Sequence, residues 1–548
     1  MENSLTEITG MINGLSIKGG DVAEYECLLS LLNTLEISDI RRILRKCDFM
    51  KLFAAMNLQE GKVMDVALKL ANKLFSGVPL VELIAQHEPE VMQALEAENP
   101  ELTMFVLEKL KAGISGTSTA DFLTENVLSV IIRLAVHDDL RIAKSSVSFL
   151  SDIATEIPGG IHKVFGASSV ARFVAACNRS EYALRISELA ADVSVKVPKH
   201  FEVIRKSGVL DILLTGLLER DPLIVLNFIE VTKKILVLPD GYDWIPSALL
   251  NGMLSRLAGW KNDPTGRLIL PGFFAFFGCV ASLNPLEWLA ESELKKENSF
   301  LRTLKDAVED SDPSVVLAAA EPICSVCHKK QGRRELKKHL IPSGALFPLI
   351  VRLGHFLRES PTTVILPAVA YVSQLIRQPD DITNALEGIE QTRIALEWTA
   401  YVARMGEVPS DRTLDIGEQL LSVGKLLKRL MTLAANPFID VRLAALQALG
   451  SMSSQPWGVR VFVDQPGFMK YLLDRKTEAG LAKTAVLMQM KYEIVQGILC
   501  TMEQYTGYDT TDFSVLLSPE QMLCLKLYIK EGIWGIQSSD AAVAMEPG

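Results

Sequence analysis

The sequence predicts an all-α, HEAT/armadillo-like superhelix built from stacked helical pairs (an α-solenoid). Three observations predict it: helix-start signals recur roughly every 40 residues, glycine-centred breaks recur in a second phase, and no segment shows the sustained two-residue alternation of a strand. The chain has 548 residues, of which 49% are apolar and 22% are charged. This length and composition suit a folded protein with a large buried core.

The helix-start signal is a capping residue, often followed by proline, ahead of an apolar run. Clear examples are Asn99-Pro100, Asp221-Pro222, Asp312-Pro313, Ser360-Pro361 and Asn436-Pro437. An Asp, Asn or Ser side chain caps free backbone N–H groups at a helix start, where proline needs no donor. Each pair therefore predicts the beginning of a helix.

These signals define a repeat. Equivalent positions in successive segments are residues 64, 103, 141, 185, 225, 316, 365 and 442. The first five are 38–44 residues apart, and HEAT and armadillo units recur at roughly 40–47 residues. The intervals of 91 and 77 residues are close to twice the others, so we expect each to contain one further, degenerate repeat.

The glycine breaks give a second phase of the same period. Ser207-Gly208, Ser343-Gly344 and Pro466-Gly467 precede apolar helices, and their glycines are 136 and 123 residues apart, near three repeats each. Two kinds of break at one period predict a helix–turn–helix unit. We therefore expect residues 1–537 to form one continuous solenoid, with divergent first repeats within residues 1–115. The small, polar segment Ser538–Gly548 is predicted to be a disordered tail.

Charge and composition narrow the class of function. A net charge of −10 and a pI near 5.4 argue against broad binding to nucleic acid or an anionic membrane. Met1–Glu7 lacks the features of a signal peptide, and eight cysteines are too sparse for a disulfide framework. The longest uncharged run, between Arg267 and Glu287, is interrupted by Pro271 and Pro285 and is predicted to be a buried helix. We expect a protein of the cytoplasm, with the nucleus as a second compartment.

The sequence offers no catalytic motif. It contains no glycine-rich nucleotide loop and no G-x-S-x-G, and His87-Glu88 lacks the second histidine of H-E-x-x-H. The seven histidines are scattered along the chain, as solvated or capping histidines are. The chain is therefore predicted not to be an enzyme and to use no cofactor.

One string suggests a metal or haem. Cys324-Ser325-Val326-Cys327-His328 matches C-x-x-C-H, the attachment pattern of c-type haem, and could supply zinc ligands together with His339. Haem attachment requires export, and structural zinc sites usually use two close pairs of ligands. Core cysteines on a helix that runs on from Asp312 are the favoured interpretation.

A basic run follows immediately and contains our candidate partner-binding residues. They are Lys329, Lys330, Arg333, Arg334, Lys337 and Lys338. Three interpretations are open: a solvated loop between helices, an electrostatic contact for an acidic partner, and a nuclear localisation signal. The run lacks the interleaved aromatic residues that favour nucleic-acid binding.

Several strings resemble a known family. Leu270–Gly278 resembles the L-P-G-F-x-x-F-F-G segment of the 26S proteasome non-ATPase regulatory subunit 5 family. Gln455–Gly458 and Gln465–Arg475 are similar to its Q-P-W and P-G-F-x-x-Y-x-x-D-R elements, and Lys491–Val495 resembles its K-Y-E-L-V. The first half matches only as a repeat pattern. The aromatic cluster Phe273–Phe277 within the first string is predicted to pack in the core, with a partner groove as the alternative.

The resemblance implies a function that composition and periodicity do not reveal. It implies a HEAT/armadillo-like chaperone for assembly of the proteasome regulatory particle, which holds the C-terminal domain of an ATPase base subunit and leaves before the particle is finished. Such a protein is expected to be monomeric by itself. A general HEAT-repeat scaffold or a karyopherin-like transport adaptor would explain the architecture and the acidity equally well, but not the shared strings.

Overall fold

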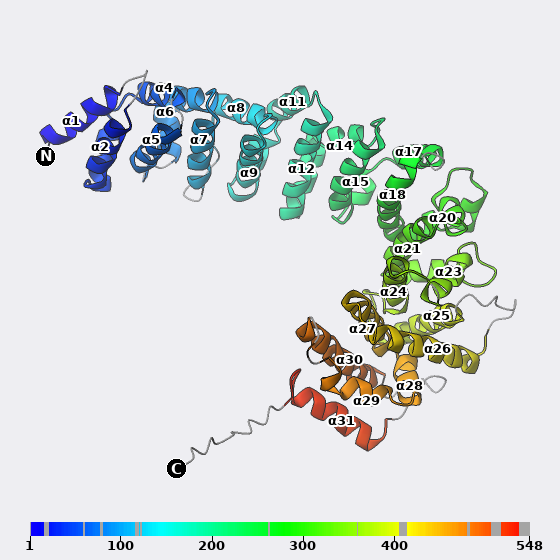
Figure 1. Cartoon of the computed structure of the whole chain (residues 1–548). Coiled ribbons are helices and arrows are strands. Elements are labelled where there is room, and N and C mark those ends of the chain that lie inside the picture. The colour runs from blue at the N-terminus through cyan, green and yellow to red at the C-terminus, as the bar shows by residue number, and fades with distance from the viewer. Residues whose placement is uncertain are drawn as a thin grey trace, which may run out of the picture. The chain divides into compact units, whose positions relative to one another are not determined.

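The computed structural model contains only helices as regular elements in the residues that it describes, so the all-α prediction is confirmed (Figure 1). The described residues are 2–15, 21–58, 61–76, 80–114, 120, 123–260, 264–358, 360–404, 414–478, 480, 483–505 and 517–535. They form two compact units, residues 1–246 and 247–548. A continuous solenoid over both units stays a prediction, and the predicted tail Ser538–Gly548 lies outside the described residues.

Unit 1 is a double row of helices. Its elements are α1 (Glu2–Asn13), α2 (Val22–Asn33), α3 (Ile37–Leu44), α4 (Phe49–Asn57), α5 (Gly61–Leu74), α6 (Leu80–Leu95), α7 (Pro100–Ala112), α8 (Glu125–Ala135), α9 (Leu140–Glu156), α10 (Gly160–Val164), α11 (Ala167–Ala176), α12 (Ser180–Lys196), η3 (Pro198–His200), α13 (Phe201–Ser207), α14 (Asp211–Gly216), α15 (Pro222–Leu236) and α16 (Gly241–Trp244). Helices α2, α5, α7, α9, α12 and α15 lie side by side as a long row, and α4, α6, α8 and α11 form a flanking row (Figure 1).

Unit 2 repeats this arrangement with larger connections. Its elements are α17 (Ser247–Trp260), α18 (Pro264–Leu283), α19 (Pro285–Trp288), η4 (Glu291–Lys295), α20 (Phe300–Val308), α21 (Pro313–Cys327), α22 (Lys330–Lys337), α23 (Phe347–Arg358), α24 (Thr362–Ile376), α25 (Ala385–Ala403), α26 (Ile416–Ala434), α27 (Ile439–Ser453), α28 (Pro456–Asp464), α29 (Phe468–Leu473), η5 (Arg475–Glu478), α30 (Thr484–Gln504) and α31 (Pro519–Lys530). The long row is α18, α21, α24, α27 and α30, and the other helices flank it.

Most predicted helix starts are confirmed by their capping bonds. The side-chain oxygens of Asn99, Asp221 and Asp312 accept from the backbone N–H two residues further on, at 2.8–3.0 Å. Asn436 makes the same bond at 2.9 Å, but α27 begins only at Ile439. The Asn-Pro signal therefore locates this turn and misses the helix start by two residues.

The two long intervals have different explanations. The 91-residue interval contains an additional long-row helix, α18, which packs against α21, as predicted. In the 77-residue interval α24 packs directly against α27, and the hydroxyls of Ser373 and Ser451 are 2.8 Å apart. The prediction of a hidden repeat is wrong there. The extra length is instead taken up by α25 and α26, each of 19 residues, which pack against each other beside the row.

Helix α18 contains the long apolar run. Gly266–Leu283 is long and apolar enough to cross a membrane, but 56% of it is buried, and α18 packs against α17 and α21. Phe277 is fully buried, with its ring 5.8 Å from that of Trp288, so core packing of the aromatic cluster is confirmed. A Cβ on Gly278 would lie 2.6 Å from the Cα of Pro322, so glycine is required where the two helices touch.

Candidate partner-binding surface

The basic run is not a loop, because its residues form the short helix α22. Arg333 within it is fully buried. Its guanidinium donates to the backbone oxygen of Arg377 at 2.6 Å and lies 5.4 Å from the ring centroid of Trp398. A side chain held in this way does not reach a partner, so the partner-binding prediction is wrong for Arg333.

Two further cations of the run fasten α22 to α25. Lys330 Nζ donates to the Glu387 carboxylate at 2.8 Å, and Arg334 forms an ion pair with Glu390. The hydrogen bond from Lys330 is the main reason why the pKa of Glu387 falls to about 2, and the one from Arg334 lowers the pKa of Glu390. Partner contact stays a prediction for the three exposed cations of the run, which are Lys329, Lys337 and Lys338.

The cysteine string lies at the end of α21, inside the core. Cys324 and Cys327 are buried, burial raises the pKa of Cys327 to about 12, and the Sγ of Cys324 is 3.7 Å from the carbonyl oxygen of Tyr371. The core-cysteine interpretation is therefore confirmed. His339 is bonded to a carbonyl oxygen at the end of α19. The described residues contain no group of three or more side chains placed to hold a metal ion.

The strings that resemble the family hold the last helices of unit 2 together. Lys491 is fully buried, and its Nζ donates to the carbonyl oxygens of Tyr471 (2.7 Å) and Asp474 (2.9 Å) and lies 3.7 Å from the Glu478 carboxylate. Burial is the main cause that lowers the pKa of Lys491, to about 8. Arg475 donates to carbonyl oxygens at the end of α31, at 2.9 and 3.1 Å.

The Q-P-W string has the same structural role. Gln455 Nε2 donates to the carbonyl oxygen of Ile376 at 2.6 Å, and Trp457 Nε1 donates to that of Thr392 at 3.2 Å. Gln455 and Trp457 are fully buried, so these bonds join α24, α25 and α28 in the interior. Gln455, Trp457 and Lys491 of the shared strings therefore build the fold, and their buried side chains are not available to a partner.

A partner surface is better sought on the open face of each long row, which we define as the side that the flanking row leaves uncovered. In unit 1 this face carries charges that bridge neighbouring helices. Asp152 on α9 lies 3.5 Å from both Lys111 on α7 and Lys196 on α12. Lys234 on α15 lies 2.7 Å from Asp192 on α12. The open face of unit 1 is thus a ladder of partly exposed ion pairs.

The long row of unit 2 is nearly neutral along four of its five helices, whereas the fifth, α30, carries the exposed carboxylates Glu493 and Glu503. Helices α7, α9, α12 and α15 carry 16 charged side chains, whereas α18, α21, α24 and α27, of similar total length, carry four. Past the first turns of these four helices, Glu321 is the one charged residue. Uncharged residues with partial or full exposure on these helices include Pro271, Ala275, Cys279 and Ser282 on α18, Ser325 on α21, Pro367, Tyr371 and Gln374 on α24, and Leu443, Gln447 and Ser451 on α27.

Such a face suits contact with a folded domain. The centres of protein interfaces are depleted of charged residues, because a neutral surface loses little hydration energy when it is covered. Sequence reasoning missed this face and selected the basic run instead. The signal was present in the long uncharged helices, but they were interpreted as core, and a partner groove was considered as an alternative for Phe273–Phe277 alone.

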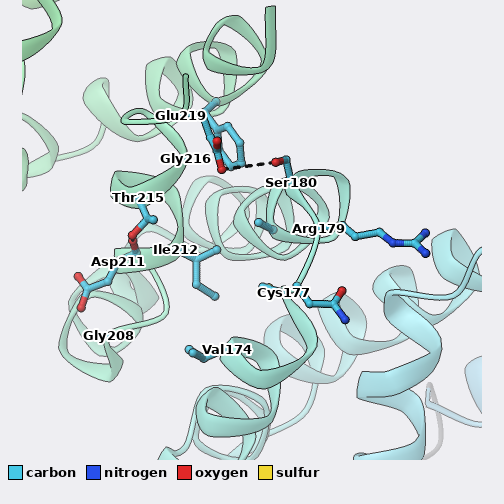
Figure 2. A pocket seen from close by; sticks show the side chains of 13 residues that line it. Val174, Cys177, Arg179, Ser180, Gly208, Asp211, Ile212, Thr215, Gly216 and Glu219 are labelled. Carbon is cyan, nitrogen blue, oxygen red and sulfur yellow. Dashed lines mark hydrogen bonds between the residues drawn. The ribbon is translucent and has the colours of Figure 1, made fainter. Parts of the chain in front are cut away.

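A cleft opens in unit 1 beyond α11, beside the short helices α13 and α14 (Figure 2). The cleft has a volume of about 530 Å³, and Phe228 of α15 contributes to its wall. Val174 and Ile212 supply apolar side chains, and the hydroxyl of Ser180 donates to the Glu219 carboxylate at 3.4 Å (Figure 2).

Comparison with known proteins places the chain among proteasome-associated proteins. A family model described as "Proteasome non-ATPase 26S subunit" matches residues 7–390 and 408–548. The chain is 20% identical over 514 residues to the 26S proteasome non-ATPase regulatory subunit 5 of Bos taurus, and 19% identical over 515 residues to that of Homo sapiens. Each alignment covers 93% of this chain and 93% of the relative.

Two solved structures align with most of this chain. The karyopherin Kap121p bound to the extreme C-terminus of the phosphatase Cdc14p aligns with a TM-score of 0.48 and 12% identity, over 97% of this chain and 53% of that one. The chain thus spans about half the length of that karyopherin. An engineered protein aligns with a TM-score of 0.31 and 13% identity, over 91% of this chain and 99% of that one.

Proposed function

Because the chain belongs to the 26S proteasome non-ATPase regulatory subunit 5 family, we propose that it is a non-catalytic chaperone for assembly of the proteasome regulatory particle. The observation that carries this proposal is the family match over nearly the whole chain. We place its action in the cytoplasm, with the nucleus as a second compartment. A helical-repeat body suits a protein that holds another protein during assembly.

The proposed client is the C-terminal domain of an ATPase base subunit, and its proposed seat is the neutral open face of unit 2. This face presents mostly uncharged residues from four neighbouring helices, with Glu321 as the one charge past their first turns, so a folded domain can cover it while burying few charges. A chaperone must later release its client, so its binding face does not need ion pairs that become buried on binding. The exposed cations Lys329, Lys337 and Lys338 are proposed to affect mainly the rate and salt dependence of association.

A matched pair of substitutions tests this seat. Ala275→Arg places a cation at a partly exposed site on the neutral face of α18, and Ala112→Arg places the same side chain at an exposed site at the end of α7 in unit 1. Ala275→Arg should weaken binding to isolated ATPase base subunits by about tenfold or more, because the new charge must be desolvated. Ala112→Arg should leave the affinity unchanged. Equal affinities for both variants would place the client elsewhere.

Capture from a cell lysate separates this function from the alternative. The proposal expects proteasome ATPase base subunits without the finished 26S particle. Transport cargo captured in place of these subunits would favour a karyopherin-like adaptor, and a mixture of unrelated proteins would favour a general scaffold.

A further inference from the structure

The last helix, α31, has an unexpected outer face. It packs against α30 (Figure 1). Its buried side chains are Leu525 and Tyr528. The terminal repeat of a solenoid normally turns a polar face outward. Here Leu523 and Leu527 are 58% and 44% exposed on the side away from the two buried residues. The helix is therefore apolar on two sides, and α30 covers only one of them.

The exposed leucines belong to a regular stripe. Glu520, Leu523, Leu527 and Lys530 are spaced by three, four and three residues, and all four are exposed. This is the spacing by which one helix packs along another. We call these four residues the α31 stripe. In the described part of the chain no ion pair is seen for Glu520 or Lys530.

The α31 stripe is complementary to itself in one orientation. In an antiparallel pair of α31 helices centred on position 525, Leu523 faces Leu527 of the second copy, and Glu520 faces Lys530. The leucine contact and the ion pair each occur twice, as in any isologous twofold interface. A parallel pair would bring each charge against its own kind, which is unfavourable.

We propose that the α31 stripe is a self-association surface, on which the same helix of a second copy docks in antiparallel orientation. One helix pair buries less area than standard stable interfaces, so the dimer should be weak, with a dissociation constant of roughly 10–100 μM. The expected monomer is thereby replaced by a monomer–dimer equilibrium. This inference uses α31 alone and does not depend on the proposed chaperone function.

Charge-swap variants of the full-length chain test the orientation. Sedimentation equilibrium over about 1–200 μM should show a mass that rises from one chain of 60.3 kDa toward two. Glu520→Lys and Lys530→Glu should each weaken the dimer by roughly tenfold, because both ion pairs become repulsive. The double variant Glu520→Lys/Lys530→Glu should restore the affinity, because the pairs re-form in reverse.

Two further variants complete the test. Leu523→Glu should abolish the dimer, whereas Lys470→Glu, which changes an exposed cation on α29, should have no effect. All substituted side chains are exposed, so thermal melts should be unchanged. A mass of one chain at every concentration overturns the proposal. A dimer that the single charge variants do not weaken, or that the double variant does not restore, overturns it as well.

Discussion

The two units stack similar helix pairs but place their charges differently. In unit 1 the charges are numerous, partly exposed and paired across neighbouring helices, as in the pairs of Asp152 and Asp192. In unit 2 the helices α18, α21, α24 and α27 are nearly neutral. Several charges of this unit lie in the interior, among them Arg333, Glu478 and Lys491. An exposed pair contributes little to stability, whereas a buried charge that loses its partners costs several kcal/mol. Although the two units share one architecture, we therefore expect loss of a charged side chain to destabilise unit 2 much more than unit 1.

The sharpest test of this contrast is Lys491→Met. It removes three hydrogen bonds and leaves the buried carboxylate of Glu478 with one fewer cation. We expect unit 2 to lose about 3–5 kcal/mol of stability. Tryptophan fluorescence during urea unfolding measures this, because five of the six tryptophans lie in unit 2. Lys144→Met, at an exposed site on α9, is the control, and an equal loss in both variants would contradict the contrast.

A smaller loss is expected from Trp457→Phe, which tests a neutral contact in the same interior. The substitution keeps an aromatic ring but removes the 3.2 Å bond to the carbonyl oxygen of Thr392. The buried acceptor and the reduced ring should cost about 1–3 kcal/mol in the same unfolding experiment. Trp534→Phe, at a ring that is 55% exposed, should change stability by less than about 0.5 kcal/mol. Equal losses of stability for Trp457→Phe and Trp534→Phe would mean that the interior tolerates the loss of the indole N–H of Trp457.

Breaking one ion pair on the open face of unit 1 should lower stability only slightly, and the loss should depend on salt concentration. Lys234→Met breaks the 2.7 Å ion pair with Asp192, in which both side chains are partly exposed. We expect a loss of less than about 1 kcal/mol, which should shrink further in 1 M salt because exposed charges are screened. Circular dichroism during urea unfolding at two salt concentrations measures this. A loss as large as that of Lys491→Met would remove the distinction between the units.

The smallest effect on stability should come from acid titration of Glu387, whose carboxylate accepts a hydrogen bond from Lys330 and so joins α25 to α22. The pKa of Glu387 is lowered from 4.5 to about 2, chiefly by its hydrogen bond from Lys330. An acid whose pKa is lowered in the folded state stabilises the fold while it is ionised, so this contribution is complete above pH 4.5 and is lost as the pH falls toward 2. Glu387→Gln should therefore flatten the fall in stability between these pH values. Glu503→Gln, at an exposed glutamate of α30, should leave the slope as in the unchanged chain.

Local signals predicted the repeat, and contacts distant in sequence decided the rest. The caps at Asn99, Asp221 and Asp312 act within two residues, so the sequence alone locates them. The burial of Arg333 depends on Trp398, which lies 65 residues further along the chain on another helix. A dense basic run therefore suggested a surface, although one of its side chains belongs to the interior. The neutral open face likewise emerges only when four separate helices are seen side by side.

The interior position of the shared strings bears on how such proteins diverge. Gln455, Trp457 and Lys491 are fully buried, so changes at these positions are limited by folding and not by the choice of partner. The surface residues of the long rows face no such limit. A chain that is 20% identical to a relative, as this one is to the bovine protein, can therefore keep such interior residues while its surface residues change. Searches with the shared strings group proteins by architecture, and client specificity must be determined separately for each member.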